Sequence, residues 1–315
     1  MMFNLLQECK EAKNIGITGH VRPDGDCVGS CMALYLYLKK TMPNADIMVY
    51  LEESARVYHH IDCIDEIDTT YAAKESYDVF FCLDCSPERT GQGQELYNRA
   101  LKKINIDHHI TNSGCGDLNY IQPEIGSTAE LIYQLIPENA LDNEIAKALY
   151  IGIIHDTGVF QFSNTLPSTM IAGSKLIQYD IDFANLIQES FYEKTYKQTK
   201  IMAEAVLKSQ MYLDGKCLIS YFTKEEMVRL QAEIPDFTGI INRLKTVKDI
   251  DCAVFMYETE TDNYKVSLRT SDRVDATAIT TVFGGGGHVK AAGCNISGTV
   301  DEVIKILIAE IARQL

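Results

Sequence analysis

Short apolar runs alternate with helical patterns through the first half of the chain. The most nearly continuous run, residues 77–83, is typical of a strand buried on both faces of a parallel sheet. Shorter strands are predicted at residues 15–17, 47–51 and 103–106. Strands that alternate with helices favour βαβ units, so this half of the chain predicts an open, mostly parallel, doubly wound α/β sheet.

Helical spacing of apolar residues predicts helices at residues 27–40, 143–154, 168–179 and 182–190. Ser127 stands three residues before Glu130, a capping-box spacing that starts a further helix ending at Leu135. A short strand is expected at residues 159–162. Residues 193–208 are polar with a helical pattern, which indicates a connecting helix.

The second half repeats neither the order nor the spacing of the first. It predicts strands at residues 216–222, 251–257 and 263–268, and helices at 223–231, 239–244 and 302–311. A length of 315 residues favours two domains. We therefore expect a catalytic, metal-binding domain at 1–190, a helical linker at 191–210, a smaller α/β substrate-binding domain at 211–315, and a cleft between the domains.

Composition and charge narrow the class of protein. With 46% hydrophobic residues the chain can bury substantial cores, whereas its net charge of −15 argues against binding long duplex nucleic acid. Bound divalent ions would still admit a small anionic substrate. No apolar leader and no run near the ~18 residues of a membrane span is visible, so we expect a cytoplasmic protein without membrane contact.

The 10 cysteines are scattered singly, which indicates reduced thiols rather than a disulfide framework. The one close pair, Cys82 and Cys85, is interpreted as buried thiols at a strand end. A redox or zinc role for this pair is the alternative, but no second pair follows at zinc-finger spacing.

Carboxylates and imidazoles follow the predicted strands of the first domain. His20, Asp24 and Asp26 lie on the turn after the first strand, and Asp84 ends the buried strand 77–83. Because the carboxyl ends of parallel strands share one edge, where α/β sheets bind ligands, we expect these side chains to meet there.

The same edge receives groups from later elements. Asp107, His108 and His109 directly follow the strand 103–106, and Asp156 stands at the end of a predicted helix. A His-His pair alone would be weak evidence for a site, but its place at a strand end strengthens it. His59 and His60, by contrast, have no acidic neighbour at ligand spacing, so a packing or surface role is predicted for them.

Four carboxylates and two imidazoles suit Mn²⁺, with Mg²⁺, Co²⁺ or Fe²⁺ as alternatives. Six ligands are too many for one catalytic ion with open positions, but they suit two ions that share a bridging carboxylate. This composition predicts two-metal phosphoester hydrolysis. The predicted ligands are His20, Asp24, Asp26, Asp84, His108 and Asp156.

A glycine-rich stretch in the second domain is a candidate anion site. Four glycines precede a histidine there, and their amides could cradle an anion beside the imidazole. Ser267 and Arg269 on the preceding strand could face the same anion. A plain flexible loop is the alternative; a Walker A loop is excluded because no Lys-Ser or Lys-Thr follows. The stretch consists of Gly284, Gly285, Gly286, Gly287 and His288.

Together these motifs resemble the DHH/DHHA1 phosphoesterase family, named for a motif seen here as Asp107-His108-His109. The resemblance extends from the turn at His20 to the glycine-rich stretch, which is nearly the full length. Layout and length look most like the nanoRNase subgroup, which hydrolyses short oligoribonucleotides and the phosphomonoester of 3′-phosphoadenosine 5′-phosphate (pAp).

The resemblance also implies roles for the metal ligands. His20, Asp24 and Asp84 would hold one Mn²⁺, and Asp84 would bridge to a second. The second ion would be held by Asp26, Asp84, His108 and Asp156.

Further roles implied by the resemblance concern catalysis and substrate binding. Asp107 would orient the site. His109 would contact the scissile phosphate and stabilise charge or protonate the leaving group. Arg269 and the glycine-rich stretch, with Gly286 and His288, would grip the other phosphate or a terminal nucleotide. Arg89 looks like a family residue too, with a structural ion pair as the alternative.

Several substrates and functions remain open at this point. The partners expected are short single-stranded RNA or DNA, pAp or dinucleotides. The oligomeric state is open, and a homodimer is one option because dimers are the commonest assembly among soluble oligomers. A cyclic or linear dinucleotide phosphodiesterase is the nearest alternative. A family II pyrophosphatase lacks the glycine-rich stretch, and an exonuclease for long single strands needs more domains. A catalytically inactive nucleotide-sensing module is the alternative from a different class.

Overall fold

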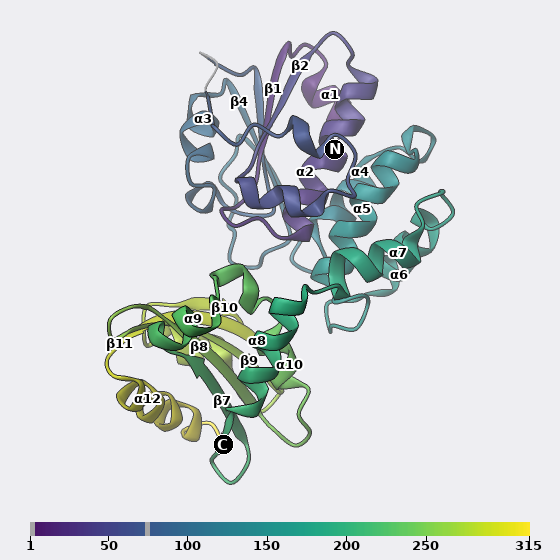
Figure 1. Cartoon of the computed structure of the whole chain (residues 1–315). Helices are drawn as coiled ribbons and strands as arrows, with labels where there is room; N and C mark the ends of the chain where they lie inside the picture. The colour runs from purple at the N-terminus through teal and green to yellow at the C-terminus, as the bar shows by residue number, and fades with distance from the viewer. Residues whose placement is uncertain (1–3, 73–75) are drawn as a thin grey trace. The chain divides into compact units, whose positions relative to one another are not determined.

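The computed structural model describes residues 4–72 and 76–315. The chain divides into two compact units, Met1–Glu193 and Lys194–Leu315. Each unit is built on its own sheet, five-stranded in the first and six-stranded in the second (Figure 1). Within the described ranges, no helix combines the length and the apolar character needed to cross a membrane.

The first sheet is parallel throughout, in the order β2-β1-β3-β4-β5. This confirms the predicted mostly parallel sheet. The order reverses between β1 and β3, the position at which such sheets bind ligands outside the carboxyl ends of their strands. The strands are β1 (Asn14–Thr18), β2 (Asp46–Tyr50), β3 (Val79–Leu83), β4 (Lys102–Asp107) and β5 (Leu118–Ile121).

Helices cover both faces of this sheet. Phe81 belongs to the large core that includes α2 and α5, whereas its neighbours Phe80 and Cys82 pack with Tyr97 of α3 on the other face. The helices are α1 (Leu5–Cys9), α2 (Gly25–Thr41), α3 (Gly93–Arg99), α4 (Thr128–Leu135), α5 (Asn143–Asp156), α6 (Pro167–Leu176) and α7 (Phe183–Ile187), with short turns η1 (Glu53–Tyr58), η2 (Ile64–Glu66), η3 (Pro87–Arg89), η4 (Glu138–Ala140) and the π-helical η5 (Gln188–Tyr192).

The close approach of α2 and α5 depends on a glycine. A Cβ on Gly29 would lie 2.6 Å from the carbonyl oxygen of Ala148 and 2.8 Å from the amide nitrogen of Gly152. Both atoms are backbone and cannot turn away. Because α2 carries Asp26 in its first turn and α5 ends at Asp156, this packing places both carboxylates.

The strand predicted at residues 159–162 is wrong. Val159 and Phe160 have φ of 56° and 61°, in the left-handed region. The amide of Val159 donates to Ile154 and that of Phe162 to Thr157, so this segment is a series of turns that continues from α5. Val159 and Phe160 pack against the core, whereas Phe162 is exposed.

The second sheet is mixed, in the order β10-β11-β9-β8-β7-β6, with one parallel pair, β7 and β8. A smaller α/β second domain was predicted, but three of its strands, β6, β10 and β11, were missed. The strands are β6 (Gln210–Tyr212), β7 (Cys217–Phe222), β8 (Cys252–Glu260), β9 (Asn263–Thr270), β10 (Gly286–His288) and β11 (Ala291–Ser297).

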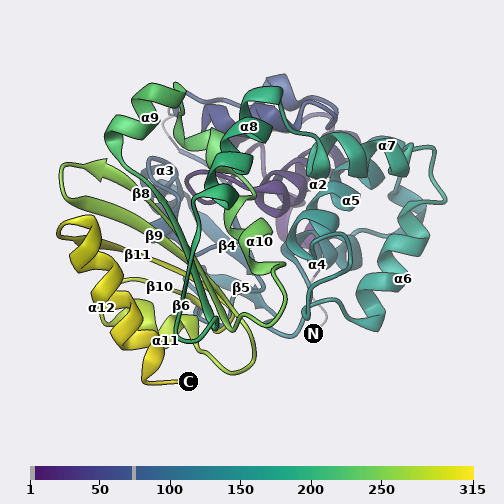
Figure 2. The ribbon, with the colours of Figure 1, turned by 60° about the horizontal axis from the view of Figure 1, so that its bottom comes forward.

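Each face of this sheet has its own core. The helices α12 and α10 lie on opposite faces (Figure 2). Leu307 and Ile311 of α12 lie in one core, and Ile240 and Leu244 of α10 lie in the other. The predicted connecting helix corresponds to α8, which packs within this unit through Ile201. The helices are α8 (Tyr196–Leu207), α9 (Lys224–Leu230), η6 (Ile234–Phe237), α10 (Ile240–Lys245), α11 (Ala276–Thr281) and α12 (Val300–Ala312).

Candidate metal centre and substrate site

Three strands of the first sheet deliver the candidate ligands to one edge. His20 follows β1, Asp84 follows β3, and His108 follows β4. Asp24 is the N-cap of α2, where its Oδ1 accepts the amides of Asp26 and Cys27 at 3.1 Å. The cap turns the chain from β1 into α2 and keeps the acidic turn beside the strand ends.

The six predicted ligands come together around two imidazoles. Nε2 of His20 lies 3.7 Å from Oδ1 of Asp24 and 3.5 Å from Oδ2 of Asp84. Nε2 of His108 lies 3.6 Å from Oδ1 of the same Asp84. Asp84 therefore turns one oxygen toward each histidine, as a bridging carboxylate must.

The second imidazole completes the set. Nε2 of His108 also lies 3.6 Å from Oδ2 of Asp156 and 3.9 Å from Oδ2 of Asp26. Ligands of one ion, at bonds of about 2.0–2.2 Å, are separated by about 3–3.5 Å. The distances from Nε2 of His108 to these carboxylate oxygens are slightly longer than the spacing between two ligands of one ion. They are also too long for hydrogen bonds.

The tautomers of both histidines suit a metal ion. Nδ1 of His20 donates to the carbonyl of Val21 at 3.0 Å, and Nδ1 of His108 donates to the carbonyl of Ile125 at 3.2 Å. In the neutral form of each ring, the Nε2 lone pair then faces carboxylate oxygens, which are also acceptors. A cation between them resolves this conflict, and imidazoles that bind metals are commonly held in this way.

The carboxylates are too crowded to be ionised together without positive charge. Burial and the charges of Asp84, Asp156 and Asp24 raise the pKa of Asp26 well above its ordinary value. Burial raises the pKa of Asp156 to about 7; the charge of His108 opposes this shift, and those of Asp84 and Asp24 add to it. These residues therefore fit divalent cations.

The buried carboxylates are also held by hydrogen bonds that the sequence analysis did not anticipate. Asp26 accepts the amides of Thr128 at 2.7 Å and Ala129 at 2.8 Å, at the N-terminus of α4, where unpaired amides favour an anion. The Thr128 hydroxyl donates to Oδ1 of Asp84 at 2.9 Å. Asp84 itself has a φ of 61°, a strained backbone conformation that re-aims its side chain at the strand end.

Asp107 organises the segment after β4. Its Oδ1 accepts the amides of His108 and His109 and the Nδ1 proton of His109, the last at 2.7 Å, and its Oδ2 accepts from Asn112 at 2.6 Å. Burial alone would lower the pKa of His109, but this hydrogen bond and the charges of Asp84 and Asp107 raise it. His109 is thereby oriented beside the carboxylates, with its Nδ1 3.7 Å from Oδ1 of Asp84.

Three further residues near the centre escaped the sequence analysis. The buried Cys27 forms a cluster with His20 and Asp84 in which the potential ligand atoms lie within 4.8 Å of one another. Nδ2 of Asn164 donates to Oδ2 of Asp156 at 3.1 Å. Asn112, like Asn164, lies on a loop without regular periodicity. Spacing along the chain contains no signal for any of these contacts.

Arg89, the remaining predicted residue of the first unit, lies on η3, and its carbonyl accepts the amide of Val21 at 2.8 Å. The other predicted residues lie in the second unit. Two rows cross the three strands at the β10 edge of the second sheet. One row is Gly286, Gly293 and Ser267, and the other is His288, Ala291 and Arg269. Residues paired in register point to the same face, so strand pairing brings Arg269 and His288 to one face of this edge.

The glycine-rich stretch is partly a strand at this edge. A Cβ on Gly285 would lie 2.3 Å from the carbonyl oxygen of Gly293, and one on Gly287 would lie 2.4 Å from that of Ala291. These two glycines are needed for β10 to pack on β11. A Cβ on Gly286 would meet nothing within 4 Å, so its lack of a side chain leaves open space. Nε of Arg269 donates to Oδ1 of Asn242 at 3.2 Å, which helps to hold the guanidinium.

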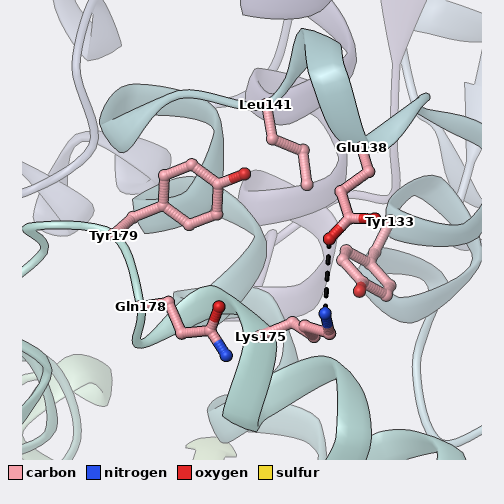
Figure 3. Close-up of a pocket in the computed structure, with 6 residues that line it drawn as sticks. All are labelled: Tyr133, Glu138, Leu141, Lys175, Gln178 and Tyr179. Atoms are coloured by element: carbon pink, nitrogen blue, oxygen red, sulfur yellow. Dashed lines mark hydrogen bonds and ion pairs between the residues drawn. The ribbon is translucent and has the colours of Figure 1, made fainter.

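A cavity of about 220 Å³ in the first unit contains none of the predicted site residues. Its two polar side chains in contact are Lys175 and Glu138, 3.3 Å apart (Figure 3). It is lined by Tyr133, Glu138, Leu141, Lys175, Gln178 and Tyr179. The cavity is therefore not part of the candidate metal centre.

Two family models match the chain, one for each unit. The model described as DHH family, N-terminal domain matches residues 14–153, and that of the DHHA1 domain matches residues 215–313. A bifunctional oligoribonuclease and PAP phosphatase NrnA of Thermus thermophilus is 28% identical, over 96% of this chain and 90% of that protein. The protein of the same name in Bacillus subtilis is also 28% identical, over 91% and 90%.

Among solved structures, an exopolyphosphatase-related protein of Bacteroides fragilis has the same fold. It superposes with a TM-score of 0.89 at 24% identity, over 98% of this chain and 94% of that chain.

Proposed function

The chain belongs to the DHH phosphoesterase family and joins a DHH domain to a DHHA1 domain, and from this we propose that it hydrolyses short oligoribonucleotides and pAp with two bound Mn²⁺ ions. It is a metal-dependent phosphoester hydrolase. We propose in addition that its substrates are short oligoribonucleotides and pAp and that its metal is manganese. The relatives named as oligoribonuclease and PAP phosphatase support the substrates. The oxygen and imidazole donors support Mn²⁺.

The observation that carries the proposal is the position of Asp84. Its two oxygens face two different imidazoles, at 3.5 Å from His20 and 3.6 Å from His108. We assign His20, Asp24 and Asp84 to one ion, and Asp84 with the cluster of Asp26, His108 and Asp156 to the other. Two such ions, when bound, supply a water of lowered pKa and a positive clamp on the phosphoryl oxygens.

His109 is the candidate for proton transfer. Its Nδ1 donates to Asp107 at 2.7 Å, and we assign the other ring nitrogen, Nε2, to the substrate. The hydrogen bond to the Asp107 carboxylate favours the protonated imidazole, which can stabilise charge on the scissile phosphate and donate a proton to the leaving oxygen. Asp107 acts through His109, as a positioning residue.

In the DHHA1 domain we assign Arg269, His288 and the glycines of β10 to a second phosphate of the substrate. Arg269 supplies a charge and a fork of donors, which suits phosphate. The open space at Gly286 allows a ligand to approach the backbone. Ser267, in register with Gly286 through Gly293, adds a hydroxyl donor.

The test is a turnover panel on the full chain with Mn²⁺. We expect hydrolysis of di- to pentaribonucleotides to mononucleotides and of pAp to AMP, with slower turnover of short DNA and cyclic dinucleotides. A preference for cyclic or linear dinucleotides would replace the proposed substrates. No turnover of any member would leave a nucleotide-sensing module as the better interpretation.

Asp84→Ala should lower kcat by roughly 10³-fold or more while the domain remains folded, because the variant lacks the carboxylate that faces both imidazoles. Asp78→Ala is the matched control. Asp78 lies just before β3, at the opposite end from Asp84, and accepts the amides of Lys13 and Asn14. Wild-type kcat in Asp84→Ala would remove Asp84 from the mechanism.

His288→Ala should raise KM about tenfold or more and change kcat little, because it removes a donor to a phosphate that is not the reacting one. Asn295→Ala, an exposed position on β11, is the control and should retain the wild-type KM. An unchanged KM in His288→Ala would contradict the assignment of the β10 edge to substrate binding.

A further inference from the structure

A second group of metal-type side chains lies in the first unit, apart from the catalytic centre. His59 and His60 follow η1, and Glu189 lies in the π-helical turn η5. One potential ligand atom from each of the three residues lies within 4.8 Å of the other two. Single π-helical turns are rare in proteins, and those that do occur often lie at functional sites.

The hydrogen bonds of His59 resemble those of the catalytic ligands. Nδ1 of His59 donates to the carbonyl of Val57 at 3.2 Å, which leaves the lone pair on Nε2. His20 and His108 are held by the same kind of bond from Nδ1 to a backbone carbonyl. Such a bond holds an imidazole in the tautomer that binds metal through Nε2.

His60 is held differently, and only one of its two ring nitrogens has a partner among the described residues. Its Nε2 contacts Oε2 of Glu189 at 2.5 Å, and the side chain is 11% exposed. Its Nδ1 is buried and has no hydrogen-bond partner among the described residues. The rings of His59 and His60 lie 4.0 Å apart at an angle of 34°, so both imidazoles line the same small region beside Glu189.

We propose that His59, His60 and Glu189 form a second cation site, which binds an ion of the zinc type. Two imidazoles and one carboxylate suit Zn²⁺, Cu²⁺ or Ni²⁺ better than Mn²⁺ or Mg²⁺, and three protein ligands leave the fourth tetrahedral position to water. The ion replaces the proton between His60 and Glu189, and the carboxylate turns slightly to widen the 2.5 Å contact. That movement is available because Glu189 is 38% exposed.

The site joins two distant parts of the chain. His60 and Glu189 are 129 residues apart, and η5 is followed directly by Glu193, the last residue of the first unit. A bound ion would therefore tie the segment after η1 to the chain just before it enters the second unit. The simpler alternative is an ion pair of protonated His60 with Glu189, without an ion.

Equilibrium dialysis of the full chain against Zn²⁺ separates these two cases. The protein is first saturated with Mn²⁺, then dialysed at micromolar Zn²⁺, and both metals are counted by mass spectrometry. The variants are His59→Gln and Glu189→Gln, because both side chains are accessible enough to change without loss of the fold. Asp180→Asn, an exposed carboxylate of the same unit, is the control.

We expect the wild type and Asp180→Asn to retain one equivalent of Zn²⁺ more than either variant. Zn²⁺ that replaces Mn²⁺ at the catalytic centre adds equally to all four proteins, so the difference reports the second site alone. Equal Zn²⁺ in all four proteins overturns the proposal and leaves the ion pair. Circular dichroism and Tm of each variant establish that the fold is retained.

Discussion

At the scale of single residues, hydrogen bonds from neighbouring side chains hold the candidate residues in position, and Asp107 is the clearest case. Asp107 is fully buried and accepts hydrogen bonds from the amides of His108 and His109, from the His109 ring and from Asn112. It therefore positions one proposed ligand and one proposed proton donor at once. Partners of this kind typically change metal affinity or activity by about 10–100-fold when they are mutated.

Asp107→Asn should lower kcat about 10–100-fold. An amide oxygen can still accept the two backbone amides, so the fold persists, but the charge that favours protonated His109 is lost. The measurement is kcat on pAp together with a Mn²⁺ titration. Asp117→Asn is the matched control, since Asp117 also accepts a backbone amide, that of Lys103 at 2.8 Å, elsewhere in the domain. A kcat equal to that of the control would show that Asp107 is structural only.

At the scale of elements, the four consecutive glycines at the start of β10 do not share one role. Some are needed for packing against β11, and one is proposed to leave space for a ligand. Gly285 and Gly287 are explained by the close approach of β11, whereas no described residue comes within 4 Å of a Cβ placed on Gly286. A sequence pattern treats these glycines alike. Their different surroundings appear only once β10 and β11 are paired.

The pair Gly285→Ala and Gly286→Ala tests this division. Gly285→Ala should destabilise the protein by about 1–3 kcal/mol, because the methyl group meets backbone that cannot give way. Gly286→Ala should leave Tm within about 1 °C of the wild type, since its methyl group meets nothing in the fold, and it should raise KM several-fold by crowding the ligand. Thermal unfolding and steady-state kinetics of both variants give the answer. A wild-type KM in Gly286→Ala would mean that no ligand approaches this strand.

At the scale of the whole molecule, the net charge of −15 and the carboxylates of the first domain oppose a compact state unless cations are bound. At the centre, burial first and then the charges of neighbouring carboxylates raise the pKa values of Asp26 and Asp156. Divalent ions should therefore stabilise the first domain as well as activate it.

Removal of metal by a chelator should lower the Tm of the first domain by several degrees, and Mn²⁺ should restore it. At 100 times the Kd, a bound ion contributes about 2.7 kcal/mol. Asp156→Asn should remove part of this Mn²⁺-dependent gain, and in chelator it should be at least as stable as the wild type, because one repelling carboxylate is gone. Differential scanning calorimetry with and without Mn²⁺ measures both effects. An equal Mn²⁺-dependent gain in the variant would exclude Asp156 from metal binding.

What the sequence determined by itself is local. Short apolar patterns predict β1, β3 and β4, and each of these strands is followed by residues whose chemistry suits a metal, so the edge of the sheet and its candidate ligands could be predicted. This works because strand ends and the residues after them are neighbours along the chain. The same logic failed for residues 159–162, where a short apolar run forms turns.

The tertiary structure alone decided which distant groups meet. The short strands β5 and β10 have too few residues for a periodic pattern, and they exist because β4 and β11 offer them hydrogen bonds. Thr128 reaches Asp26 and Asp84 only through the packing of α4. Glu189 meets His60 across 129 residues, which is why a pair of histidines without acidic neighbours in the sequence becomes a candidate cation site in the fold.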